Sequence, residues 1–360
     1  MMPVDRIQMV SFRNHNKTDM RFKSGINVIW GENGAGKTSV LEAVYLLSIG
    51  KSFKTNRTVD TIKYDKEIFR VEGVFSTKNK KDKISFSQSK DKRKKIKINN
   101  REVKTVELVG KNPVVLLSPE EQNTTKGANG DRRKYFNRLY SVVSISFFQN
   151  LSSYTKILKQ RNALLKNKTE DSSLDVWDEK LAEHGAGVWK EKETMDEKFK
   201  ECLKKISKLY NKESVDVLLE TEEKKKNKAL FLIELKKARR KDKIVGRTSV
   251  GPHKDGSTFL FNGKNLRSFG SQGEHKIALI LIKLAEYMFI CEEKKKKPTL
   301  LLDDLFAKLD FERSDAVLAL LNKNTQTIIT NTDLVDIKNH GINLEDPNNC
   351  GFYLERPCSN

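Results

Sequence analysis

The stretch of sequence that decides the fold reads Gly31-Glu32-Asn33-Gly34-Ala35-Gly36-Lys37-Thr38. It matches the pattern G-x-x-x-x-G-K-[ST] of a phosphate-binding P-loop, also called Walker A. A β-branched apolar run, residues 25–30, precedes it and predicts a buried strand, and residues 39–47 predict a helix. Glycines let successive backbone N–H groups turn toward phosphate oxygens, and the helix N-terminus adds partial positive charge. The sequence therefore predicts an α/β nucleotide-binding fold.

The residues at the end of this loop have distinct expected roles with ATP and Mg²⁺. We expect Lys37 to reach the β- and γ-phosphates and the Thr38 hydroxyl to bind Mg²⁺. Ser39 completes the expected set of nucleotide-binding residues.

A P-loop needs an acidic partner strand, and the apolar run 299–302 ends in two acidic residues, Asp303 and Asp304. We expect Asp303 of this Walker B motif to hold Mg²⁺ through water, and Asp304 to act as general base on the attacking water. A strand that ends in two aspartates is also ordinary turn chemistry, so the interpretation depends on the P-loop.

A third motif precedes a predicted amphipathic helix, residues 276–293. Ser271, Gln272 and Gly273 fit the signature with which ATP-binding-cassette proteins bind the γ-phosphate of a nucleotide held by a second subunit. A serine at a helix start can also be a simple cap, and this alternative stays open. Downstream, Asp310 falls where such ATPases carry a D-loop.

The composition points to a polyanionic partner. The chain has 69 Lys and Arg against 48 Asp and Glu, a formal net charge of +21, although a Lys-rich composition can also be a habit of a whole proteome. No run of about 20 apolar residues predicts a membrane span. The N-terminus lacks a basic segment followed by an apolar one, and the four cysteines have no zinc-ligand spacing. We therefore expect a cytoplasmic protein with reduced, metal-free cysteines.

Hydrophobic periodicity changes along the chain. Apolar residues alternate loosely over 68–103, with a turn at 99–101, and this predicts antiparallel strands whose charged runs are solvated. Residues 147–210 then change to a helical period, which Gly185 and Gly187 are expected to interrupt. The pattern is typical of a helical insertion without a long coiled coil.

Strands are expected to return near residue 225, including a segment at 231–235 and a hairpin at 261–264. The chain is thus expected to have an ATPase head in two parts. Residues 1–125 carry Walker A, and residues 226–360 carry the signature, Walker B and D-loop. A lever-like helical domain, residues 126–225, lies between them.

Further stretches outside the P-loop share their order and sequence with one known family. They are Ser11-Phe12-Arg13-Asn14-His15, residues 41–48 and 50–55, Ser118-Pro119-Glu120, Lys126-Gly127 with Arg132-Arg133, residues 154–166, 177–182 and 249–255. Together they resemble the RecF family of SMC-like ATP-binding-cassette ATPases, which has F-R-N-Y first, L-E-A-I-Y-L-L-S…G-R-S-x-R-T after Walker A, and G-P-H-R-D in the last stretch. The matches span residues 1 to about 335.

The resemblance implies a fold and a mode of nucleotide binding. The expected fold is an α/β P-loop ATPase head of the ATP-binding-cassette type, with a mixed sheet and an antiparallel β-subdomain, plus an inserted, mainly helical domain. Each ATP with its Mg²⁺ is expected to lie between the P-loop of one copy and residues 271–273 of the other copy in an ATP-dependent homodimer. Arg13 is expected to approach the nucleotide, although the sequence is nearly as compatible with a surface arginine after a strand.

The resemblance also implies an activity and partners. Such a dimer clamps duplex DNA at gaps or single-strand/double-strand junctions, independently of sequence, and helps to load recombinase in repair and replication. Slow ATP hydrolysis, dependent on DNA and Mg²⁺, releases the DNA. The implied protein partners are RecR and RecO. An alternative is an SMC-like ATPase of a defence or toxin system that acts with a partner nuclease.

Two positions depart from the family's pattern. After Ser271-Gln272-Gly273 the family reads Q-Q-R, whereas this chain has Glu274, His275 and Lys276, and lysine lacks the guanidinium fork. A predicted buried strand near 327–331 ends in polar groups, as a γ-phosphate switch requires. It has Asn331 where the family has a small hydroxyl residue or alanine.

Clusters of basic residues are candidates for phosphate contacts with DNA. They are Arg132, Arg133, Arg138, Lys236, Lys237, Arg239, Arg240 and Lys241. Each is also compatible with simple solvation, and no motif for reading bases is visible.

Overall fold

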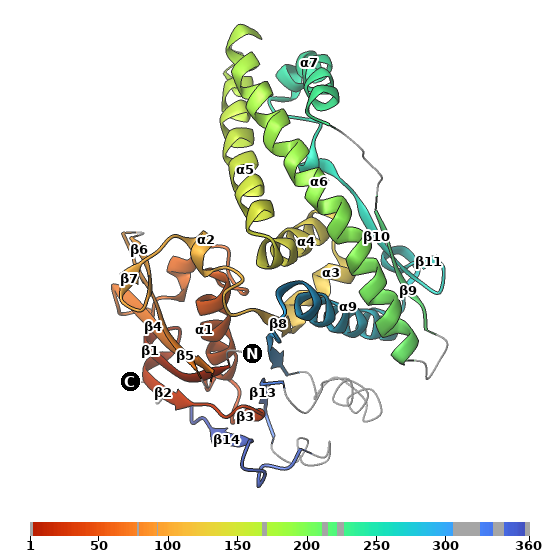
Figure 1. Ribbon diagram of the computed structural model, residues 1–360. Coiled ribbons are helices and arrows are strands. Elements are labelled where there is room, and N and C mark those ends of the chain that lie inside the picture. Colours follow the sequence, from red (N-terminus) through yellow and green to blue (C-terminus); the bar gives the residue numbers. More distant parts are fainter. Residues whose placement is uncertain are drawn as a thin grey trace. The chain divides into compact units, whose positions relative to one another are not determined.

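The computed structural model describes residues 3–77, 79–91, 93–167, 171–210, 215–221, 227–304, 325–333 and 342–356. The chain forms two compact units, drawn in Figure 1. One comprises Met1–Gln122 with Ile282–Asn360, and the other comprises Asn123–Leu281. Over the described residues, no helix combines the length and apolar character that a membrane crossing requires.

The first unit contains a five-stranded parallel sheet with strand order β14-β3-β13-β12-β8. The strands are β3 (Ile26–Trp30), β8 (Val114–Leu117), β12 (Thr299–Asp303), β13 (Thr327–Asn331) and β14 (Cys350–Tyr353). Every residue of β8, β12 and β13 is buried, as expected for parallel strands covered on both faces. In this strand order, β3 precedes Walker A and β12 carries Walker B, and one strand, β13, separates them.

The same unit contains a six-stranded antiparallel sheet with strand order β2-β1-β4-β5-β6-β7. Its strands are β1 (Val4–Phe12), β2 (His15–Arg21), β4 (Ile68–Thr77), β5 (Lys80–Ser89), β6 (Lys94–Ile98) and β7 (Arg101–Glu102). Asn99 and Asn100 have φ of 50° and 68° and join β6 to β7, which confirms the turn expected here. Helix α1 (Lys37–Ile49) packs against strands of both sheets.

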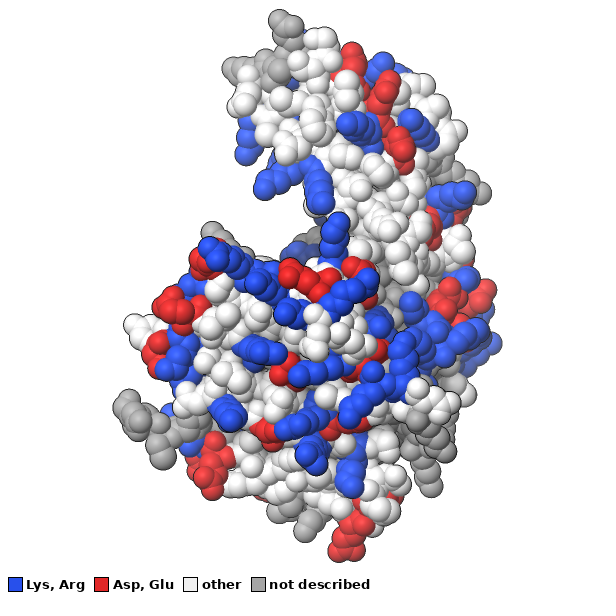
Figure 2. All heavy atoms as spheres, turned by 60° about the vertical axis from the view of Figure 1, so that its left-hand side comes forward, with Lys and Arg blue, Asp and Glu red and all other residues white. Residues whose placement is uncertain are grey.

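The charged runs of this unit lie on the solvent side of the antiparallel sheet. Figure 2 shows Lys and Arg spread among Asp and Glu over the side that carries this sheet. Glu72 forms ion pairs with Arg70 at 2.7 Å and with Lys83 at 3.3 Å. The described lysines of this run, Lys80, Lys81 and Lys83, are exposed, as the sequence predicted, whereas Asp82 is buried. Short helical segments complete the unit: η1 (Thr58–Thr61), α2 (Thr105–Leu108) and η2 (Pro119–Gln122).

The second unit is mainly helical, with a small antiparallel sheet of order β11-β10-β9. Its helices are α3 (Asn123–Lys126), α4 (Asn129–Val143), α5 (Ile145–Lys166), α6 (Asp171–Tyr210), α7 (Lys228–Val245), η3 (Pro252–Lys254) and α8 (Leu266–Phe269). Helix α9 (Gln272–Lys294) begins in this unit and ends in the other. The strands are β9 (Val217–Thr221), β10 (Ser257–Phe261) and β11 (Lys264–Asn265), and β10 and β11 form the expected hairpin.

The strand predicted at 231–235 is wrong, because this segment lies within helix α7. Phe231 and Leu235 are both buried and lie one helical turn apart on the same face, whereas Ile233 between them is exposed. Asn227 caps the helix by accepting a hydrogen bond from the Leu230 N–H at 2.9 Å. A short apolar run of this kind is compatible with a buried strand and with a helix, so its periodicity alone could not distinguish the two.

Gly185 and Gly187, which together with polar residues interrupt the heptad pattern, do not break the helix itself. Helix α6 runs without a break for 40 residues through both positions. A Cβ at Gly185 would lie 2.5 Å from Cε1 of Phe231, and one at Gly187 would lie 2.8 Å from Nδ2 of Asn150. The glycines therefore permit side chains of α7 and α5 to pack directly on the backbone of α6.

We expect Gly185→Ala to lower the free energy of unfolding by about 1–3 kcal/mol, because the new methyl group overlaps the buried Phe231 ring. Urea unfolding monitored by circular dichroism would measure the change. Gly130→Ala is the matched control, because the nearest atom to its Cβ would be Nη2 of Arg133 at 3.7 Å. Equal stability of the two variants would contradict the packing role of Gly185.

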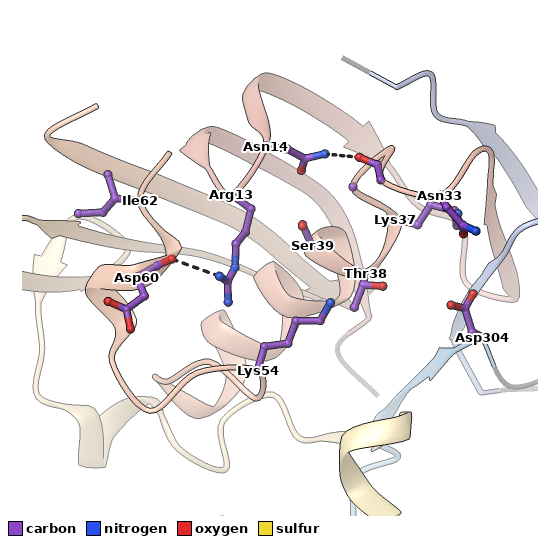
Figure 3. Close-up of a pocket in the computed structure, with 12 residues that line it drawn as sticks. Arg13, Asn14, Asn33, Lys37, Thr38, Ser39, Lys54, Asp60, Ile62 and Asp304 are labelled. Carbon is purple, nitrogen blue, oxygen red and sulfur yellow. Dashed lines mark hydrogen bonds between the residues drawn. The ribbon is translucent and has the colours of Figure 1, made fainter. Parts of the chain in front are cut away.

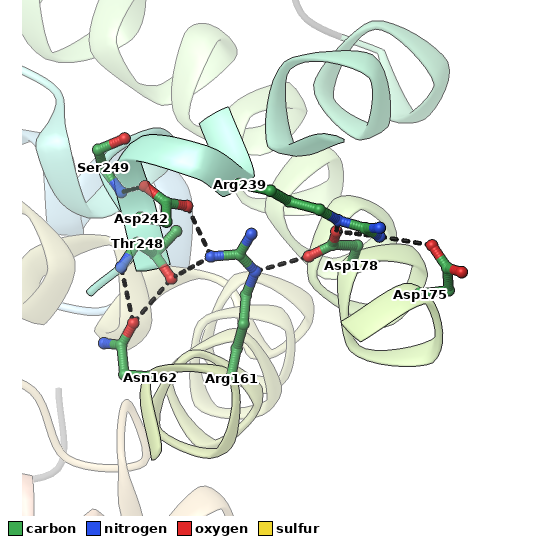
Figure 4. A network of polar contacts seen from close by, with 8 residues as sticks. All are labelled: Arg161, Asn162, Asp175, Asp178, Arg239, Asp242, Thr248 and Ser249. Carbon is green, nitrogen blue, oxygen red and sulfur yellow. Dashed lines mark hydrogen bonds and ion pairs between the residues drawn. The ribbon is translucent and has the colours of Figure 1, made fainter. Parts of the chain in front are cut away.

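A buried ionic network joins three helices of the second unit (Figure 4). Arg161 of α5 is fully buried and donates from Nε to Asp178 of α6 at 2.6 Å. Its Nη1 donates to Asp242 of α7 at 2.7 Å and to the Thr248 hydroxyl at 2.9 Å. Asp178 also accepts from Arg239 Nε at 2.8 Å. The network links α5, α6 and α7 through Arg161, Asp178 and Asp242, whose side chains are fully buried.

Arg161→Ala should destabilise the protein by about 3–5 kcal/mol, because it leaves two carboxylates buried without their shared cation. Chemical denaturation would test this, with Lys159→Ala on the exposed side of the same helix as the control. An effect no larger than that of the control would show that the network contributes little to stability.

Candidate nucleotide-binding site

The P-loop lies between β3 and α1, as the sequence predicted. Gly36 ends the loop with φ of 97°, a conformation that favours glycine. A Cβ at this position would lie 2.5 Å from Nε2 of His15. The loop therefore fits closely against the turn between β1 and β2, and only glycine satisfies both requirements.

The loop borders a cavity of about 540 Å³ in the first unit (Figure 3). Its lining residues are Arg13, Asn14, Asn33, Gly34, Gly36, Lys37, Thr38, Ser39, Lys54, Asp60, Ile62 and Asp304. Seven of these twelve were predicted to bind nucleotide, and an eighth, Asp304, was predicted to act as the general base. The other predicted loop residues, Gly31, Glu32 and Ala35, lie in the same loop, and Ala35 is buried.

Asp303 connects the start of α1 to the parallel sheet. Its Oδ1 accepts hydrogen bonds from the hydroxyls of Thr38 and Thr330, each at 2.8 Å. Burial raises the pKa of Asp303, and the two hydrogen bonds oppose that change. A carboxylate and a hydroxyl oxygen at this distance form the hard oxygen donor set that Mg²⁺ prefers, so the residues fit this ion.

Asp304 lines the same cavity, and one of its side-chain oxygens, the buried Oδ1, has no hydrogen-bond partner among the described residues. The residue has φ of 47°, and its N–H donates to the Thr330 hydroxyl at 3.2 Å. A carboxylate that lines the cavity is placed to accept a hydrogen bond from a water beside the γ-phosphate. The geometry therefore suits a general base.

Lys37 is held within the P-loop. Its Nζ donates to the carbonyl oxygens of Gly31 at 2.7 Å and Glu32 at 3.0 Å. Burial lowers its pKa, and the nearby charges of Asp304 and Asp303 oppose that change. A phosphate would give this ammonium stronger, charge-assisted hydrogen bonds than two neutral carbonyls do.

Two residues that support the loop were missed as site residues. Asn14 Nδ2 donates to the Gly34 carbonyl at 2.8 Å, and His15 Nε2 lies 3.1 Å from the Gly36 carbonyl. Burial lowers the pKa of His15. Both residues directly follow Arg13 in the family's first motif. The sequence therefore singled them out, but no role was predicted for them.

The predicted switch strand is β13, but the hydroxyl that faces Walker B belongs to Thr330. Asn331 is buried, and its side-chain amide bonds to the residues that directly follow it. It donates to the Asp333 carbonyl at 3.0 Å and accepts from the Thr332 N–H at 2.9 Å. The departure at Asn331 therefore leaves the hydroxyl beside Asp303 in place.

Ser271 caps helix α9. Its Oγ accepts from the Glu274 N–H at 3.2 Å, and its own N–H donates to Glu274 Oε2 at 2.7 Å. This reciprocal pair is a capping box, and it lowers the pKa of Glu274. Ser271 and Gln272 are exposed. The signature residues 271–273 lie in the unit that lacks the P-loop, and the predicted D-loop residue Asp310 lies outside the described residues.

The structure gives internal partners to several candidate DNA contacts. Arg132 is only 4% exposed and donates to the carbonyls of Ser257 at 2.6 Å and Gly127 at 2.9 Å. Arg133 donates to the Asp255 carbonyl at 2.7 Å. Arg132 therefore bonds to backbone carbonyls inside its own unit, and its buried position does not suit a phosphate contact.

The candidates on α7 divide in the same way. Arg239 belongs to the ionic network of Figure 4, where it pairs with Asp175 and Asp178. The remaining candidates are exposed: Lys236, Lys237, Arg240 and Lys241. Arg138 of α4 lies over the ring of Tyr135, 5.5 Å from its centroid.

The fold and the cavity define a P-loop ATPase head of the ATP-binding-cassette type. Residues 3–340 match the family described as RecF/RecN/SMC N terminal domain. The chain is 34% identical over 350 residues to the DNA replication and repair protein RecF of Thermoanaerobacter sp. (strain X514), covering 94% of this chain and 96% of that protein. The RecF of Bacillus cereus (strain G9842) is 32% identical, with 93% of each chain covered. This chain belongs to the RecF family.

Solved structures agree with this assignment. The recombination mediator protein RecF-ATPrS in the RecFOR pathway superposes with a TM-score of 0.86 at 32% identity, covering 93% of this chain and 94% of that one. An SMC head bound to the C-winged helix domain of ScpA has a TM-score of 0.53 at 17% identity, covering 93% of this chain and 91% of that one, and shares the fold alone. The expected fold class and family are confirmed.

Lys37→Ala should weaken ATP binding by roughly 10- to 100-fold, because it removes hydrogen bonds from a charged donor to phosphate. Titration with a fluorescent ATP analogue would measure the affinity. Lys17→Ala on the exposed strand β2 is the control. Unchanged affinity in the Lys37 variant would show that the cavity of Figure 3 is not the phosphate site.

Proposed function

We propose that this protein is an ATP-dependent DNA-binding protein of recombinational repair and replication. The single observation that carries the proposal is the cavity in which Lys37, Thr38 and Asp304 face one another beside Asp303. Relatives named as DNA replication and repair protein RecF cover nearly the whole chain at 32–34% identity and support it. They do not favour the alternative of a defence or toxin ATPase with a partner nuclease.

The chain's own residues have defined roles in ATP hydrolysis. Thr38 and Asp303 would hold Mg²⁺, Asp303 through water, and the ion would supply positive charge against the phosphoryl oxygens. Lys37 leaves the carbonyls of Gly31 and Glu32 to bind the phosphates. Asp304 orients the attacking water and accepts its proton on the side-chain carboxylate.

The cavity lies within one copy of the chain, and a second copy completes it. Residues 271–273 of that copy contact the γ-phosphate, so ATP closes a homodimer around duplex DNA at gaps or junctions. DNA stimulates the weak hydrolysis that reopens the dimer. The head comprises residues 1–125 and 226–360, and residues 126–225 act as a lever. RecR and RecO are the partners in loading recombinase.

The exposed cations of α7 make the most suitable phosphate contacts among the predicted set. Lys236, Lys237, Arg240 and Lys241 carry four charges over two helical turns. Contacts of this kind position a protein on DNA without reading its sequence. The binding is therefore independent of sequence and weakens with salt.

Asp304→Asn tests this function. We expect ATP to remain bound while turnover falls by about 100-fold or more, because the general base is lost. The ATP-bound dimer should then persist on DNA. Sedimentation with and without ATP, on gapped and fully duplex DNA at two salt concentrations, would measure it. Turnover as fast as that of the unmodified protein would remove Asp304 from this role.

Ser271→Arg is the companion variant. It leaves each copy's own P-loop intact, so monomers should bind ATP, but the added side chain blocks the approach of the second copy. A variant that still dimerises with ATP would contradict the shared site.

A further inference from the structure

The C-terminal segment, residues 348–356, lies against β3 and then against the P-loop. Strand β14 pairs in parallel with β3 up to Tyr353, opposite Trp30 (Figure 1). Beyond the strand, the Leu354 N–H donates to the Trp30 carbonyl at 2.9 Å. Gly31 has φ of 144°, and a Cβ there would lie 2.1 Å from the Leu354 carbonyl oxygen. The segment therefore leaves the sheet in direct contact with the first residue of the P-loop.

Arg356 brings a cation to the exposed tip of this loop. Its Nε would lie 3.8 Å from a Cβ at Gly34. Residues 32–34 and Arg356 are all exposed, and Arg356 does not line the cavity of Figure 3. In the described ranges of the chain, its guanidinium forms no hydrogen bond and no ion pair. Arg356 is thus available to a carboxylate or phosphate that approaches the loop from outside.

Glu274 places a carboxylate beside the signature serine. Through the capping box, its Oε2 accepts a hydrogen bond from the Ser271 N–H, and the Ser271 Oγ accepts one from the Glu274 N–H. The carboxylate cannot turn away without breaking this cap. The hydrogen bonds with Ser271 lower the pKa of Glu274, so the side chain is charged at neutral pH. The family has a neutral glutamine at this position, so the charge is a feature of this chain.

The proposed dimer brings these opposite charges to the same place. Residues 271–273 of one copy approach the phosphates that residues 34–38 of the other copy hold. Glu274 follows directly, so its negative charge comes toward a triphosphate, and like charges repel. A cation at the exposed tip of the loop, outside the cavity, offsets that repulsion, and Arg356 is placed there.

We propose that Arg356 of one copy forms an ion pair with Glu274 of the second copy when ATP closes the homodimer. The exposed tip of the P-loop, with Arg356 beside it, is thus a docking surface for the N-terminal end of α9 in that second copy. In a two-fold symmetric dimer the contact occurs twice, because each copy supplies both the cation and the carboxylate. The inference rests on the proposed function.

Charge reversal in separate copies tests the pair. Arg356→Glu and Glu274→Lys should each weaken the ATP-dependent dimer by about tenfold or more, since each homodimer then contains two like-charge contacts. An equal mixture of the two variants should dimerise with ATP nearly as well as the unmodified protein. In the mixed dimer, one contact has its charges exchanged and the other is native. Sedimentation velocity of the full chains, with one variant carrying a fluorescent label, would measure both results.

Lys95→Glu is the matched control, because it makes the same change of charge at an exposed lysine of β6. It should leave the dimer unchanged, and mixing it with Glu274→Lys should restore nothing. The affinity of Arg356→Glu monomers for ATP, from fluorescence titration, should equal that of the unmodified protein, because Arg356 lies outside the cavity.

The neutral variants Arg356→Gln and Glu274→Gln give a second measurement in which the capping box keeps an acceptor. Each should weaken the ATP-dependent dimer, and the double variant should dimerise no worse than the weaker single variant, because both changes remove the same ion pair.

Three results would overturn the inference while leaving the proposed function intact. They are dimerisation that persists in both reversal variants, a mixture that does not recover, and additive effects of the two neutral substitutions. Loss of ATP binding by Arg356→Glu monomers would also overturn it, since the residue would then act on its own loop. If the unmodified protein does not dimerise with ATP, the proposed function fails first and the inference fails with it.

Discussion

One carboxylate oxygen joins the three segments that make the site. Oδ1 of Asp303 accepts from Thr38 at the start of α1 and from Thr330 in the strand beside it. Because parallel strands end at the same edge of a sheet, β12 and β13 deliver these groups together. Burial raises the pKa of Asp303, and the hydrogen bonds from the two hydroxyls oppose that change. The loop, the acidic strand and the strand between them are therefore positioned by a single atom.

The parts of the site with a local sequence pattern were predicted, and the parts made by distant contacts were not. The P-loop and the two aspartates follow fixed spacings beside apolar runs, so both strands and α1 were found. Thr330 and Asn14 act through partners far away in the sequence, Asp303 and Gly34, and the stretches that contain them gave no sign of these contacts. Strand β14 was missed for the same reason, since four residues near the end of the chain pair with β3.

The interior of the second unit explains why the basic residues were difficult to assign. Arg132, Arg161 and Arg239 add to the net charge, yet each donates to oxygens of its own unit. Trp189 likewise donates to Asp255 at 2.7 Å in the buried interior. The net charge of the sequence counts these three arginines together with the exposed basic residues. Only burial separates them from exposed lysines such as Lys236.

The unbroken course of α6 has a mechanical consequence. At 1.5 Å per residue its 40 residues extend over about 60 Å. The contacts of Arg161 and Phe231 hold neighbouring helices against it, which resists bending. In a rod of this length, a rotation of about 10° at one end displaces the other by about 10 Å, close to the rise of three base pairs. Small angular changes at its base thus become displacements on the scale of a DNA groove.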